Sequence, residues 1–211
     1  MNGLIRKDLY VADRTGRLLM ILALVLSLVP SMGSFGSTYA MMMALMIPLN
    51  AIAYDEKCKW DRYASMLPYK VGQLVWSKYL LAYLFTLLAG GIIVLGGGLR
   101  GLITGSAVNW GETLEMILML GVSMLFVTAL GLPTLYRFGS EKGRFIMILI
   151  LGVGIGISVG LMEIFEEAPK LPSLPLPVVM AAIALLAAAA TYSSFRLSVY
   201  FYKRRLNGNY N

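Results

Sequence analysis

The chain has 211 residues, of which 58% are hydrophobic and 14% are charged, and its mean hydropathy is +0.74. Soluble domains carry about 25% charged residues, so this composition excludes an ordinary soluble fold and predicts an integral membrane protein. The net charge of +7 does not by itself indicate a nucleic-acid partner, because basic residues in membrane proteins commonly mark the cytoplasmic side.

Six apolar runs are long enough to cross a hydrocarbon core of roughly 30 Å. They predict an all-α polytopic membrane protein, with one transmembrane domain over 1–211 and spans at about 18–35, 39–54, 77–98, 113–135, 145–161 and 175–199. Residues 1–16 mix apolar and charged side chains and predict an amphipathic helix along the inner membrane surface. The stretch GSFGS before the second span predicts a tight turn, so the first two spans should form a hairpin.

The basic residues predict the orientation of these spans. All of the 18 Lys and Arg residues except Arg100 and Lys170 fall on one side of the predicted topology. Cytoplasmic loops carry the excess of Lys and Arg in membrane proteins. We therefore expect both termini and the loop after the second span to lie in the cytoplasm.

The chain lacks the residues that an enzyme or an ion-coupled carrier would need. The predicted spans contain almost no ionisable side chains, although coupling ions need such ligands near mid-membrane. There is no histidine, only one cysteine and no G-x-x-x-x-G-K-[ST] motif, so we expect no metal site and no ATP bound by this chain. Any transport must then draw its free energy from another subunit.

Two sets of small or flexible residues in the spans have two interpretations each. Gly152, Gly156 and Gly160 recur every four residues, which suits either a subunit interface or ordinary close packing of helices. Met42, Met46 and Asn50 in the second span are candidates for a cargo path. The alternatives are methionines that fill the packing and an asparagine that bonds to a neighbouring helix.

The longest polar interruption runs from Tyr54 to Lys78, and residues 55–72 form its loop. On a helix, four of its apolar side chains would share one face: Trp60, Tyr63, Ala64 and Leu67. Pro68 would end that helix. The segment is either a solvated loop on the headgroups or a helix that contacts another protein.

The segment YDEKCKWDRYASMLPYKVGQLVWSKYLLAYL, the N-terminal amphipathic helix and the six spans together resemble the membrane subunit of type-2 ATP-binding-cassette exporters. Among these, the chain resembles half-size bacterial permeases of the phenol-soluble-modulin exporter kind. The architecture covers the whole chain, and the sequence-specific part is mainly 55–81.

This resemblance implies a homodimer in the bacterial cytoplasmic membrane, seated on two copies of a separate ATPase that binds ATP and Mg²⁺. It further implies that residues 56–67 form a coupling helix docked on that ATPase and that residues 1–16 form the family's connecting helix. The docking residues would be Glu56, Lys57, Lys59, Trp60, Arg62, Tyr63 and Leu67.

The expected function is export of amphipathic peptides or other hydrophobic cargo, with this chain as a non-enzymatic transport subunit in contact with membrane lipid. The alternatives are a drug or lipid exporter permease of the same kind and a non-transporting membrane scaffold or sensor. The nearly uncharged spans favour an exporter driven from the cytoplasm, because an ion-coupled carrier would need its own coupling groups.

Overall fold

The computed structural model describes residues 2–29, 33–105, 109–150, 152–153 and 176–208. Every regular element in these ranges is a helix, which confirms the predicted all-α class. The helices are α1 (Asn2–Leu28), α2 (Gly33–Lys57), α3 (Trp60–Met66), α4 (Val71–Thr104), α5 (Trp110–Phe138), a helix over residues 140–150, and α7 (Leu176–Gly208).

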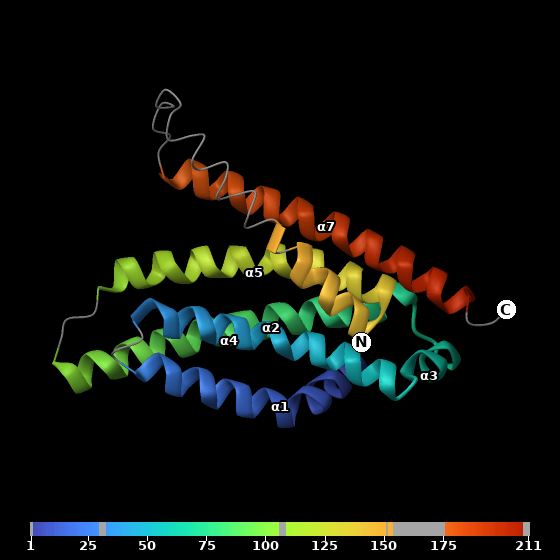
Figure 1. Cartoon of the computed structure of the whole chain (residues 1–211), viewed down its shortest axis with the longest axis horizontal. Helices are drawn as coiled ribbons and strands as arrows, with labels where there is room; N and C mark the ends of the chain where they lie inside the picture. Colours follow the sequence, from blue (N-terminus) through green and yellow to red (C-terminus); the bar gives the residue numbers. More distant parts are fainter. Residues whose placement is uncertain (1, 30–32, 106–108, 151, 154–175, 209–211) are drawn as a thin grey trace.

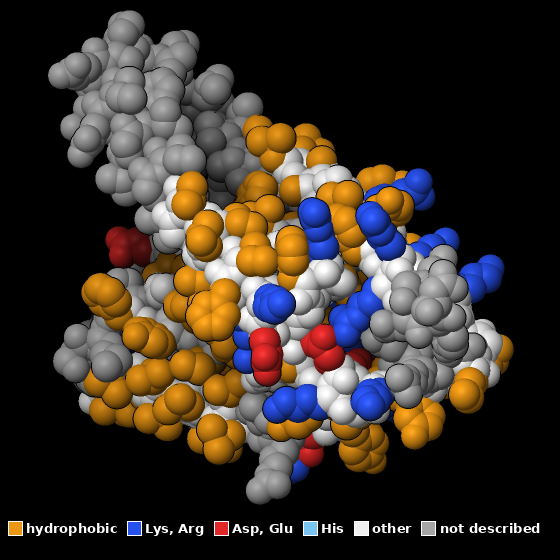
Figure 2. All heavy atoms as spheres, turned by 45° about the vertical axis from the view of Figure 1, so that its right-hand side comes forward, with side chains coloured by type: hydrophobic (Ala, Val, Ile, Leu, Met, Phe, Trp, Pro, Cys, Tyr) orange, Lys and Arg blue, Asp and Glu red, His pale blue; other side chains and the backbone are white. Residues whose placement is uncertain are grey.

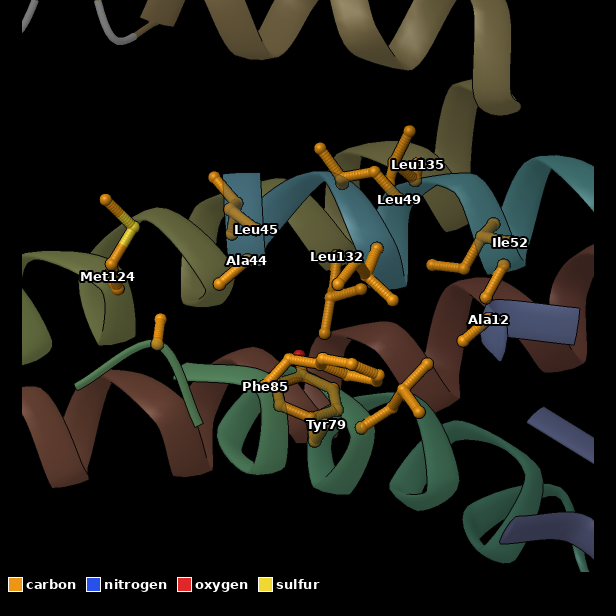
Figure 3. Close-up of a cluster of buried hydrophobic side chains, with 14 of the residues drawn as sticks. Ala12, Ala44, Leu45, Leu49, Ile52, Tyr79, Phe85, Met124, Leu132 and Leu135 are labelled. Atoms are coloured by element: carbon orange, nitrogen blue, oxygen red, sulfur yellow. The ribbon is translucent and has the colours of Figure 1, made fainter. Parts of the chain in front are cut away.

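The long helices lie beside one another, and the short α3 lies at one end of the bundle (Figure 1). Helix α1 packs on α2 and α4, α2 also packs on α4, and α5 packs mainly on α7. Their facing sides form one hydrophobic core, which Figure 3 shows around Leu45, Leu49, Tyr79, Phe85 and Leu132. The helices therefore pack through apolar faces along much of their length.

Small residues allow α1 to approach its two neighbours closely. A Cβ atom added to Gly36 of α2 would lie 2.5 Å from the carbonyl oxygen of Leu26, and one added to Gly96 of α4 would clash with the side chain of Ser27. Close approach of helix backbones through glycine is typical of membrane helices. Gly36 and Gly96 thus have a packing role.

Three described helices are long and apolar enough to cross a membrane: Phe35–Lys57, Val71–Ile103 and Trp110–Phe138. They contain the second, third and fourth predicted spans. A shorter apolar helix, Gly16–Leu28, covers much of the first predicted span. From residue 176 on, the sixth predicted span falls in α7, and the fifth begins in the helix over residues 140–150. Residues 151, 154–161 and 175 of these two spans lie outside the described residues. That these last two segments cross the membrane stays a prediction.

Two predicted boundaries near the N-terminus are wrong. The first span was expected to reach residue 35, but α1 ends at Leu28, because Pro30 follows closely and disfavours helix in the residue before it. The stretch GSFGS was expected to be a turn, but it forms the first turns of α2, where Gly36 allows the close approach to α1. Residues 2–16 are helical, as predicted, and α1 continues without a break into the stretch predicted as the first span.

Candidate functional site

Four charged side chains from three helices meet at the end of the bundle that carries α3. They are Lys7 and Asp8 of α1, Asp55 of α2 and Lys78 of α4. The Lys78 ammonium donates to Asp8 Oδ1 at 2.5 Å and pairs with Asp55 Oδ2 at 2.7 Å. The Lys7 ammonium donates to Asp55 Oδ1 at 2.6 Å and lies 3.1 Å from Asp8 Oδ1. We call these four residues the ion cluster, and the end of the bundle that holds them the polar end.

The ion cluster is sheltered from solvent. Asp8 is 1% exposed and Lys78 is 5% exposed, and the other two side chains are mostly covered. Burial alone would raise the pKa of Asp8, but the Lys78 and Lys7 ammoniums beside it hold that pKa below its ordinary value. Asp8 is therefore a carboxylate at neutral pH, and the two lysines balance the charge of the two aspartates.

Placing charge here requires particular neighbours on each helix. Leu4, Asp8 and Ala12 recur every four residues on one face of α1, and all three are buried. Asp8 thus occupies a core position of an otherwise apolar face, which is tolerated because two cations meet it. An unpaired charge at such a position would carry a desolvation cost of several kcal/mol.

A second polar group joins α2 to the C-terminal half of the chain. Glu56 Oε1 accepts from Arg205 of α7 at 2.7 Å, and Glu56 Oε2 accepts from the Ser140 backbone N–H at 2.6 Å. Ser140 begins the helix over residues 140–150, so the Glu56 carboxylate also lies at the positive end of that helix. Glu56 was predicted to dock on a partner, but it is half-buried and bonded inside the chain.

A small cavity of about 30 Å³ is lined by residues of both polar groups. Its wall includes Trp60, Tyr136 and Tyr202 besides the charged residues, and the two tyrosine rings meet edge to face at 5.4 Å. A cavity of this size, lined by several polar groups, is large enough to hold a bound water.

The predicted coupling helix over 56–67 is shorter than expected. Helix α2 continues through Lys57, and α3 begins at Trp60 after a turn in which Lys59 has φ 50°. The Cys58 N–H donates to the Tyr54 carbonyl, which closes α2, and Pro68 follows the end of α3. Glu56 and Lys57 therefore belong to α2 and not to the short helix.

The predicted apolar face of α3 is only partly buried. Ala64 is buried, and Trp60 is half-buried with the Lys7 ammonium 4.2 Å from its ring centre. In contrast, Tyr63, Met66 and Leu67 are 63%, 82% and 40% exposed. Trp60 thus fixes α3 to α1, and the outward apolar surface consists of Tyr63, Met66 and Leu67.

The remaining predicted docking residues are basic. Lys57 and Lys59 are exposed, and Arg62 lies in α3 with its side chain outside the described part of the structure. Many exposed Lys and Arg side chains gather on the right-hand part of Figure 2, while hydrophobic side chains dominate the left. The polar end is therefore rich in positive charge around the exposed apolar side chains of α3.

The candidate cargo-path residues lie on α2. Met42 and Met46 are exposed one turn apart, and Asn50 follows one turn later. Asn50 Oδ1 accepts from Arg144 Nη2 at 2.9 Å, so this asparagine makes the interhelical bond that was one of its two interpretations.

The glycine face of the fifth predicted span is described only at its start. Gly152 is exposed, and no described atom lies within 4 Å of the position of an added Cβ. Gly156 and Gly160 lie outside the described residues. The two interpretations of this glycine repeat both stand.

The sequence contained a signal for the ion cluster that was not used. Lys78 lies inside the predicted third span, where a charged residue indicates a buried partner or a functional group. Asp8 lies four residues from both Leu4 and Ala12, so the sequence places it on the apolar face of its helix. Arg205 offered no such signal, because it lies in a basic tail.

Among the described residues, no group of three or more His, Cys, Asp or Glu side chains could hold a metal ion.

The chain was compared with curated proteins, solved structures and protein families. No curated protein and no solved structure matches it. The model of a family described as ABC-2 family transporter protein matches residues 3–203, which is nearly the whole chain. Members of this family are multi-pass membrane subunits that work with an ABC ATPase. On this match, together with the apolar helices, the chain belongs to the ABC-2 family of transporter membrane proteins.

Proposed function

We propose that the chain is the permease subunit of an ATP-driven exporter for amphipathic peptides or other hydrophobic cargo. ATP and Mg²⁺ bind in a separate ABC ATPase, and this chain provides the membrane path by alternating access. Membership of the ABC-2 family supports the transport role and the ATPase partner. Peptide cargo and the outward direction rest on the resemblance of residues 55–81 to peptide exporters.

The observation that carries the docking proposal is the outward surface of α3. Tyr63, Met66 and Leu67 are exposed together on and beside a seven-residue helix at the polar end. Exposed apolar groups among charged neighbours are typical of surfaces that contact another protein. We assign this surface, with Lys59 at its edge, to the contact with the ATPase.

The ion cluster connects α3 mechanically to the membrane helices. Lys7 touches Trp60 of α3 and Asp55 of α2, and Asp8 is paired with Lys78 of α4. A displacement of α3 would therefore act on α1, α2 and α4 at once. Rigid elements joined in this way suit the transmission of a domain movement.

Two copies of the chain would complete the path. The exposed Met42 and Met46 on α2 would face the cargo or the second copy, and flexible methionine side chains accept apolar groups of varied shape. Asn50 would lie at the inner end of this path, held by Arg144.

The docking proposal is tested by the double variant Tyr63→Ala/Met66→Ala, reconstituted with the ABC ATPase that co-purifies with the wild-type chain. We expect ATPase association to weaken by roughly thirtyfold, because central interface residues commonly contribute about 2 kcal/mol or more. Pull-down and cargo-stimulated ATP hydrolysis in lipid provide the measurements. The matched control is Leu197→Ala/Tyr200→Ala, which removes two exposed apolar side chains from α7.

Equal binding and equal stimulation in the α3 variant and in wild type would contradict the docking proposal. Trp60→Ala is not a suitable substitute, because Trp60 packs against the core and its loss would also alter the position of α3. Uptake of a labelled amphipathic peptide into inverted vesicles, whose cytoplasmic face points outward, separates a transporter from a scaffold, since a scaffold would bind the ATPase without moving cargo.

A further inference from the structure

We propose that a hollow between the end of α2 and the helix over residues 140–150 binds the phosphate headgroup of an anionic membrane phospholipid. The hollow has a volume of about 590 Å³ and is lined by the last turns of α2, by residues 138–142 and by Arg144. It shares only Glu56 with the cavity beside the ion cluster, so it is separate from that cluster.

The wall of the hollow carries more free positive than negative charge. Its cations are Lys57, Lys142 and Arg144, and its carboxylates are Glu56 and Glu141. The Glu56 carboxylate is already bonded to Arg205 and to the Ser140 N–H, which offsets its charge. A cleft with such a surplus attracts anions.

Arg144 is positioned for an anion but is only partly used by the protein. Its Nη2 donates to Asn50, and its Nε is buried with no acceptor in the described part of the chain. A guanidinium has five N–H donors in a planar fork that matches the oxygens of a phosphate. The bond to Asn50 fixes the orientation of this fork at the wall of the hollow.

The surroundings of the hollow favour a lipid over a soluble phosphate. Ile148 lies one turn beyond Arg144 and is exposed. An apolar side chain thus leads away from the headgroup position along this helix, where acyl chains would lie. Tyr54 and Phe138 line the hollow and are exposed, as aromatic residues often are at membrane interfaces.

The test uses the full-length chain in detergent, titrated with phosphatidylglycerol or phosphatidylcholine and followed by native mass spectrometry. In Lys57→Gln/Lys142→Gln, we expect the affinity for phosphatidylglycerol to fall roughly tenfold or more, because each basic residue near a lipid surface contributes measurably to anionic lipid binding. Glu141→Gln removes a carboxylate from the same wall and should increase that affinity by a few-fold. Phosphatidylcholine binding should change little in either variant.

The matched control is Lys59→Gln/Lys70→Gln, which removes two exposed charges from the polar end but none from the hollow. An equal loss in this control would overturn the site and indicate a diffuse surface effect. A decrease or no change with Glu141→Gln would also overturn it. Inorganic phosphate that competes as strongly as phosphatidylglycerol would overturn the lipid assignment. None of these measurements needs the ATPase, so the proposed docking surface is tested separately.

Discussion

At the scale of single residues, Lys78 is the more deeply buried of the two lysines in the ion cluster. Its ammonium is buried and bonded to two carboxylates from different helices, Asp8 and Asp55. Replacing a buried ion pair by apolar groups can be neutral, whereas removing one partner leaves an uncompensated charge. The lysine and its partners should therefore behave as a unit under mutation, in contrast to the exposed pair formed by Asp13 and Arg17.

We expect Lys78→Met to destabilise the protein by about 3–5 kcal/mol, because it leaves two buried carboxylates with only Lys7 as a counter-ion. The double variant Asp8→Asn/Lys78→Met should recover a substantial part of this loss. Thermal unfolding in detergent measures both effects. Arg17→Met is the control and should change stability by less than about 1 kcal/mol, since exposed ion pairs contribute little. Additive effects of Asp8→Asn and Lys78→Met would contradict direct coupling between the two side chains.

At the scale of elements, the sequence predicted helices well and their ends less well. Long apolar runs have to be helical in a bilayer, because every backbone polar group must be bonded within the segment. The ends depend on contacts that have no local pattern. Glu56, for example, is bonded to Ser140 and Arg205, which lie 84 and 149 residues further along the chain.

The candidate site shows the same division. Periodicity placed four residues on one face, Trp60, Tyr63, Ala64 and Leu67, but it could not indicate which of them would be buried. The position of Lys7 against Trp60 decides this, and it depends on α1 packing beside α2. The docking surface could thus be located from the sequence to within one helix but not to its exposed residues.

The turn between α2 and α3 provides a test at the same scale. Lys59 has φ 50°, a left-handed conformation that costs a non-glycine residue about 1–2 kcal/mol. We expect Lys59→Gly to increase stability by about 1 kcal/mol, as measured by thermal unfolding. Lys57→Gly, in the last turn of α2, is the matched control and should lower stability by up to about 1 kcal/mol. A loss of stability in both variants would show that the turn is not strained at Lys59.

At the scale of the whole molecule, the single chain exposes apolar side chains well beyond α3. Phe35, Tyr39, Met42 and Met46 follow one another along α2, and Phe145, Ile148 and Leu149 are exposed on the helix over residues 140–150. Lipid covers some of these surfaces in a membrane protein. Helices that meet another subunit usually do so through small residues, which allow the backbones to approach closely. Gly152 is the described residue that combines exposure, an open Cβ position and the four-residue glycine spacing.

The proposed homodimer can therefore be tested at Gly152, and the chain is suited to this because Cys58 is its only cysteine. In a Cys58→Ser background, we expect Gly152→Cys to form a disulfide-linked dimer of about twice 23.1 kDa on oxidation in native membranes. A disulfide requires Cα atoms within about 7 Å, so cross-linking would place the two copies of this helix in contact. Leu114→Cys, an exposed position on α5, is the control and should remain monomeric under the same oxidation. If both variants cross-link equally, the contact reflects random collision in the membrane. If Gly152→Cys stays monomeric while the wild-type chain purifies as a dimer, the two copies meet through another face, and the exposed stripe of α2 is then the surface to substitute next.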